Sequence, residues 1–73
     1  MNVTTLHLFL LAAFDMSPAE ITEKRPNIYD DVINDFLFCD FIEVKKDNRY
    51  HVTEKGKQYL IECRLIIHKG LTQ

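Results

Sequence analysis

The side chains that most often carry chemistry, cysteine and histidine, are few and widely spaced in this chain. Cys39 and Cys63 are separated by 23 residues without a Cys-x-x-Cys pair, and His7, His51 and His68 are scattered. Structural zinc sites need four ligands at short, recurring spacings, which this pattern does not supply. We therefore expect reduced cysteines packed beside apolar helix faces, and no metal or other cofactor.

Catalytic signatures are also absent from the sequence. It contains no Ser/His/Asp or Cys/His arrangement and no glycine-rich phosphate loop. The adjacent carboxylates Asp30 and Asp31 would point about 100° apart on a helix, so they do not form an acid–base pair across a cleft. A chain of 73 residues leaves little room for a substrate pocket. The sequence therefore predicts a protein that is not an enzyme.

The clearest structural pattern lies in residues 41–56, which predict a β-hairpin that leads directly into a helix. Asp47 and Asn48 mark the turn, because both residue types tolerate the left-handed backbone of a tight hairpin. Thr53 is placed to cap the helix that follows, with Glu54 near its positive end. Apolar positions alternate with polar ones on both arms of the hairpin: Ile42 and Val44, then Tyr50 and Val52.

Helix signals also occur before the hairpin. Ser17-Pro18-Ala19-Glu20 has the form of a capping box with proline at the first helical position. It predicts a short helix over residues 18–24, which must stop before Pro26. Asn27 is expected to cap a further helix that runs to about residue 40.

With a first helix over about residues 5–14, the predicted order is helix, helix, turn, helix, hairpin, helix. Over residues 5–68 this order resembles the winged helix-turn-helix superfamily. The stretch that ends in Thr53-Glu54-Lys55-Gly56 is similar to small bacterial or phage regulators of the MarR-like and PadR-like groups. The resemblance implies one α+β domain over residues 1–73, with three helices, a β-hairpin wing and a C-terminal helix. It also implies a transcriptional regulator that binds DNA as a dimer, although winged helices serve as protein-binding modules too.

For a DNA-binding regulator, the third predicted helix would lie in the major groove and the wing would contact flanking phosphates. Base edges would then be contacted by amide and phenol groups, and phosphates by basic side chains. The candidates for base contact are Asn27, Tyr29 and Asn34, and those for phosphate contact are Lys24, Arg25, Lys45, Lys46 and Arg49.

The same helix offers a different reading, because it contains no lysine or arginine. Helical spacing places Ile28, Tyr29, Val32, Ile33 and Phe36 inward and leaves Asp30, Asp31, Asp35 and Phe38 outward. Outward carboxylates would repel phosphates, whereas an exposed phenylalanine among them is typical of a protein-binding surface. The alternative function is therefore an interaction module, such as an adaptor or an inhibitor of a nucleic-acid enzyme, with a basic partner. Asp30 and Asp31 could equally serve only to stabilise the positive end of the helix.

Charge is distributed unevenly along the chain. Residues 1–40 carry two basic and seven acidic side chains, a net charge of −5, whereas residues 41–73 carry seven basic and four acidic ones, a net charge of +3. The longest charge-free apolar run is far too short to cross a bilayer, and a basic secretion signal is not present. We therefore expect a cytoplasmic protein without membrane contact.

Both terminal helices carry apolar residues on two sides. In the first helix, Leu6, Phe9, Leu10 and Ala13 suit the core, which leaves a second apolar side, and the last helix also has apolar residues outside its main stripe. A domain of this size has little chain to cover both helices. A homodimer through the first and last helices is the expected solution, and packing within the monomer is the alternative. The dimer-interface candidates are Leu8, Leu11, Ala12, Ile61 and Leu65.

Overall fold

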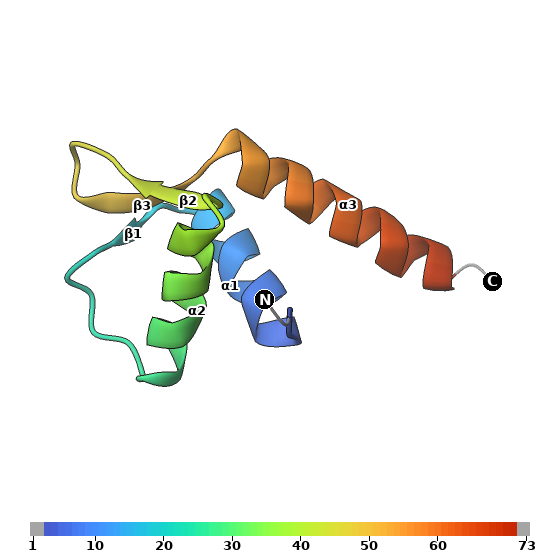
Figure 1. The fold of residues 1–73 in the computed structure, drawn as a ribbon, viewed down its shortest axis with the longest axis horizontal. Helices are drawn as coiled ribbons and strands as arrows, with labels where there is room; N and C mark the ends of the chain where they lie inside the picture. Colours follow the sequence, from blue (N-terminus) through green and yellow to red (C-terminus); the bar gives the residue numbers. More distant parts are fainter. Residues whose placement is uncertain (1–2, 72–73) are drawn as a thin grey trace.

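The computed structural model describes the backbone of residues 3–71 and the side chains of residues 3–63. Short strands lie between the helices along the chain, and β2 leads directly into β3 (Figure 1). The strands form an antiparallel sheet in the order β1-β3-β2. This α+β arrangement of three helices and a small sheet is compatible with a winged-helix-like layout. In chain order the elements are α1 (Thr5–Met16), β1 (Ala19–Glu20), α2 (Ile28–Phe38), β2 (Ile42–Val44), β3 (Arg49–Val52) and α3 (Glu54–Leu71).

The predicted hairpin is confirmed by the pairing of β2 with β3. Ile42 lies opposite Val52 and Val44 opposite Tyr50, as the alternation of apolar residues requires. Asn48 closes the turn in the left-handed conformation, with φ of 58°. Its N–H donates to the carbonyl of Lys45 at 3.0 Å, which gives the backbone reversal expected of a short hairpin loop.

The predicted helix start at Thr53 is also confirmed. The Thr53 hydroxyl accepts the N–H of Gly56 at 3.1 Å and donates to the carbonyl of Asp40, so it joins the start of α3 to the chain before β2. Gly56 is buried at this junction. A Cβ added there would lie 2.3 Å from the carbonyl oxygen of Phe41 and 2.8 Å from Val52 Cγ1. The threonine and glycine of this motif therefore hold α3 against the hairpin.

The predicted helix over residues 18–24 is wrong. Ala19 and Glu20 instead form β1, and the N–H of Ile21 extends the pairing to the carbonyl of Asn48 at 3.1 Å. An isolated helix of this length is marginal in water, so pairing along β3 outweighs the local capping signal. Irregular chain then leads to α2, and the first helix of a helix-turn-helix pair is absent from this segment (Figure 1). Asn27 precedes α2, but its side chain makes no capping hydrogen bond.

The core side of α1 also differs from the predicted one. Phe9 is 70% exposed and Ala13 is exposed, whereas Leu11, expected on the outer side, is completely buried. Relative to the predicted orientation, α1 is rotated about its own axis, because His7 faces inward towards α2. On α2 the inward residues are Val32, Ile33 and Phe36, as predicted, but Ile28 at the first turn is 63% exposed. The buried apolar residues are Leu10, Leu11, Phe14, Val32, Ile33, Phe36, Phe41, Ile42 and Leu60.

Candidate interaction surface

The outer face of α2 carries an exposed aromatic ring and carboxylates. Asp30, Asn34 and Phe38 follow one another at intervals of four residues, with Asp31 beside them, so these four share one side of the helix. All four are exposed, as the helical spacing predicts, and Phe38 is 88% exposed. The inward side of α2 is anchored in the core by Phe36. This arrangement holds a large apolar side chain and two carboxylates in water on a rigid helix.

Asp35, the remaining carboxylate of the predicted surface, has a partner within the chain. Its Oδ2 lies 2.9 Å from Nε2 of His7, which is 8% exposed. The other ring nitrogen of His7, Nδ1, accepts the N–H of Thr4 at 3.3 Å and lies 2.8 Å from the Thr4 hydroxyl. In a neutral imidazole the proton therefore resides on Nε2 and points to Asp35. The acid is thus used to join α1 to α2.

Thr4, His7 and Asp35 place a hydroxyl, an imidazole and a carboxylate in a row, as in the catalytic triad of a hydrolase. Here, however, the hydroxyl and the imidazole cap the N-terminus of α1. The Thr4 oxygen accepts the N–H of His7 at 3.3 Å and the His7 ring accepts the Thr4 N–H, which together form a reciprocal cap of α1. Sequence reasoning missed this cap, although a threonine three residues before a polar residue and ahead of an apolar run is its usual signal. None of the three residues lines the cleft described below. The geometry indicates a structural contact.

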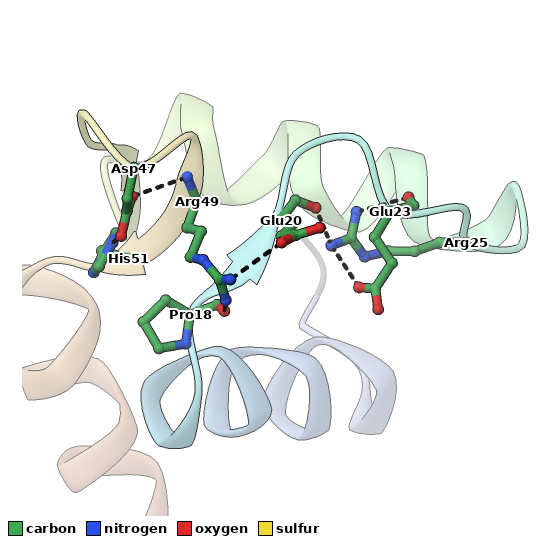
Figure 2. Close-up of polar contacts among 7 residues, drawn as sticks. All are labelled: Pro18, Glu20, Glu23, Arg25, Asp47, Arg49 and His51. Atoms are coloured by element: carbon green, nitrogen blue, oxygen red, sulfur yellow. Dashed lines mark hydrogen bonds and ion pairs between the residues drawn. The ribbon is translucent and has the colours of Figure 1, made fainter.

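Arg25, predicted to contact phosphate, is folded against the protein. One of its terminal nitrogens donates to the carbonyl of Glu20 at 2.8 Å and to the carboxylate of Glu23 at 3.0 Å (Figure 2). Its guanidinium carbon lies 5.6 Å from the ring centre of Phe14 and 5.9 Å from that of Tyr50. The side chain is only 11% exposed. Arg25 therefore covers the edge of β1 and has little capacity to meet a phosphate.

Arg49, the second predicted phosphate ligand, is also engaged within the chain. It donates to the carbonyl of Pro18 at 3.2 Å and to the Glu20 carboxylate at 3.1 Å, which ties β3 to the start of β1 (Figure 2).

In the hairpin turn, the Asp47 carboxylate accepts the backbone N–H of Arg49 and lies 2.8 Å from Nε2 of His51. The hydrogen bond with His51 is the main reason why the pKa of Asp47 is lowered from its ordinary value.

The other residues predicted to contact DNA differ in their exposure to solvent. Lys24, Lys45 and Lys46 are exposed, with Lys45 Nζ 3.8 Å from the Glu43 carboxylate. Asn27 is exposed at the start of α2, and Tyr29 is half-buried. Of the five basic residues predicted to contact phosphate, three lysines are therefore exposed: Lys24 before α2, and Lys45 and Lys46 at the hairpin turn.

A cleft of about 530 Å³ lies where the end of α1, β1 and the start of α2 meet. Its wall includes the apolar side chains of Leu10 and Phe14 and the half-buried ring of Tyr29. Charged side chains also line it, and two of them bond within the chain: Arg25 donates to the Glu20 carbonyl and the Glu23 carboxylate, and Arg49 donates to the Glu20 carboxylate. The described contacts thus give the cleft a structural role in holding the irregular segment after β1.

The two cysteines are free and half-buried in this structure. Burial and the neighbouring thiol of Cys63 raise the pKa of Tyr59, whose ring stacks on Phe41 with 4.6 Å between centres. Over the residues that the structure describes, His, Cys, Asp and Glu side chains form no group of three or more that could hold a metal ion.

The dimer-interface candidates divide into three groups. Leu11 is 0% exposed in the single chain, so its assignment to a dimer interface is corrected: it belongs to the monomer core. Leu8 and Ala12 are half-buried, and Ile61 is 51% exposed on α3. The side chain of Leu65 lies outside the described residues.

In the described part of the chain, we find no helix with the length and apolar character needed to cross a bilayer.

Comparison of the chain with models of known protein families, with characterised proteins and with solved structures gives no match.

Proposed function

We propose that this chain is a non-enzymatic protein-interaction module that binds a basic partner through the outer face of α2. The observation that carries the proposal is the 88% exposure of Phe38 beside the exposed carboxylates of Asp30 and Asp31. Leaving a phenylalanine in water forgoes about 1.5–3 kcal/mol of burial, which a partner's pocket would recover. A small adaptor or inhibitor of a protein that binds nucleic acid, acting in the cytoplasm, fits this chemistry.

The two kinds of side chain on this face would have different roles. Aromatic side chains at the centre of an interface commonly carry much of its affinity, because they are fully desolvated there. The carboxylates would direct a basic partner to the surface and select against acidic ones. The Asp35 carboxylate is oriented by His7, so the acidic side chains proposed to contact the partner are those of Asp30 and Asp31.

A selection from a random peptide library displayed on phage tests this proposal. Peptides retained by the wild-type domain should be rich in lysine and arginine, and Phe38→Ala should weaken their binding by at least about tenfold. Phe9→Ala is the matched control, because Phe9 is 70% exposed on α1 and lies outside this face. Equal loss in both variants, or retained peptides without basic residues, would contradict the proposal.

The contribution of the two carboxylates to binding can be tested separately. Asp30→Asn/Asp31→Asn should slow association and reduce its dependence on salt, whereas Asp15→Asn, at the exposed end of α1, should not. Binding that is insensitive to the first variant would remove the acidic face from the proposal and leave Phe38 alone.

A DNA-binding regulator of the winged helix-turn-helix type is the second candidate. It is supported by the order of the sheet and by the exposed Lys45 and Lys46 at the hairpin tip, with Asn27 exposed at the start of α2. A dimer through the first and last helices would present two such hairpins, and Ile61 is an exposed apolar residue of α3 that could contribute to it. The internal engagement of Arg25 and Arg49 and the acidity of α2 place this function second.

Fluorescence anisotropy with random duplex DNA, at low and at moderate salt, distinguishes the two functions. A regulator should bind with an affinity that falls steeply with salt, and Lys45→Glu/Lys46→Glu should lower both the affinity and the slope of that dependence. An interaction module with an acidic α2 should show no binding at either salt concentration.

A further inference from the structure

We propose that the free edge of β2 pairs with β2 of a second copy of this chain, antiparallel about a two-fold axis at Val44. The two sheets would then join into one, with three strands from each copy. This contact uses the backbone and side chains of β2 and not the residues of α2 proposed to bind a partner, so it does not rest on the function proposed above.

The hydrogen bonds of the hairpin show which backbone groups of β2 are free. The N–H of Lys45 donates to the carbonyl of Arg49, and the N–H of Thr53 donates to the carbonyl of Phe41. Bonded and non-bonded residue pairs alternate along an antiparallel ladder, so Glu43 is the residue of β2 that bonds across to β3. The N–H and carbonyl groups of Ile42 and Val44 therefore point away from β3.

The order β1-β3-β2 makes β2 an outer strand, so these groups lie at the edge of the sheet. The other outer strand, β1, is covered at its edge by the Arg25 guanidinium on the Glu20 carbonyl. Val44, at the middle of the proposed contact, is 48% exposed although it faces the same way as the buried Ile42. Among the residues that the structure describes, no strand pairs with this edge, and such an edge is a template for a further strand.

The charges of β2 are complementary to those of a second β2 strand that runs antiparallel to it. Glu43 and Lys45 share the solvent face of the hairpin, with side chains 53% and 56% exposed and 3.8 Å between Oε1 and Nζ. In an antiparallel pair centred on Val44, Glu43 lies opposite Lys45 of the partner subunit, and the reverse pair forms as well. Displacing the centre by one residue would put two Glu43 side chains opposite each other, which disfavours that register.

The small extent of this contact determines its strength. A strand of three residues buries far less surface than the roughly 1,600 Å² of a standard stable interface. The expected dimer is therefore weak, and its population should rise with protein concentration from the micromolar to the millimolar range.

Sedimentation velocity over a concentration series, on the full chain, tests the proposal. Glu43→Lys and Lys45→Glu should each weaken dimerisation by about tenfold or more, because like charges then face each other twice. The double exchange Glu43→Lys/Lys45→Glu should restore the wild-type value, since opposite charges again face each other. Circular dichroism of each variant should remain that of the wild type, because these exposed side chains contribute little to folding.

The variant Ile61→Asp distinguishes this dimer from one formed by the first and last helices. It should leave the dimer mass unchanged if β2 forms the contact. Wild-type mass that stays monomeric at millimolar concentration would overturn the proposal. So would dimerisation that is unaffected by Glu43→Lys, or that Ile61→Asp abolishes.

Discussion

His7 of α1 and Asp35 of α2 are joined across 28 positions of the chain by a contact of 2.9 Å between Nε2 and Oδ2. The imidazole is almost buried and packs edge-on against the ring of Phe36, with 5.8 Å between ring centres. Its second nitrogen caps α1 through Thr4. One side chain thus fixes the rotation of α1 and its position against α2.

Removal of the carboxylate should therefore destabilise the domain. Asp35→Ala leaves the His7 Nε2–H buried without a partner, and we expect the free energy of unfolding to fall by about 1–3 kcal/mol. Asn34→Ala, its exposed neighbour, should change it by less than about 0.5 kcal/mol. Urea unfolding followed by circular dichroism measures both. Equal effects would show that the contact has no net value.

Gly56 should not tolerate a side chain. Although alanine favours a helix over glycine by about 1 kcal/mol, its Cβ would lie 2.3 Å from the Phe41 carbonyl oxygen. We expect Gly56→Ala to lower the free energy of unfolding by at least about 2 kcal/mol, because backbone must move. Lys57→Ala, exposed on the next position, is the control. A more stable Gly56→Ala variant in thermal unfolding would contradict this packing.

Two adjacent basic residues should behave differently. Arg25 is nearly buried on Phe14 and Tyr50 and bonds to the Glu20 carbonyl, whereas Lys24 is exposed. Arg25→Ala should therefore cost about 1–3 kcal/mol of stability through lost packing and hydrogen bonds. Lys24→Ala should cost less than about 0.5 kcal/mol. Chemical denaturation of the two variants gives the comparison, and an Arg25→Ala variant as stable as wild type would contradict this structural role.

The hairpin turn should weaken in acid. His51 and the Arg49 N–H hold the pKa of Asp47 below its ordinary value, so ionised Asp47 favours the folded state. This contribution is complete above the pKa of the unfolded carboxyl and is lost as the pH falls through the lower, folded pKa. Asp47→Asn should consequently lower the thermal midpoint at neutral pH, with the difference from wild type shrinking below about pH 4. A difference that stays constant down to pH 2 would contradict it.

Local chemistry was enough to predict several parts of the structure. The hairpin, its left-handed Asn48 and the Thr53 cap each depend on a few neighbouring residues. The inward residues of α2 also follow from helical spacing, and so does the exposure of Phe38. The acidic face was therefore predicted from the sequence, apart from the pairing of Asp35 with His7.

Other parts depended on contacts between distant residues. The capping box at Ser17 predicts a helix, yet Ala19 and Glu20 pair with β3, because a neighbouring strand offers them hydrogen bonds that a short helix could not match. Arg25 offers no local signal of its position, since its aromatic neighbours come from α1 and β3.

The sequence by itself determined where the hairpin and its turn lie and which side of α2 is acidic, because those properties depend on residue type and spacing over a few positions. The tertiary structure alone decided that residues 19–20 become a strand, that Leu11 rather than Phe9 enters the core, and that Arg25 and Arg49 are engaged within the chain. Those outcomes depend on which surfaces meet when the chain closes, and an apolar helix with two similar sides does not specify that locally.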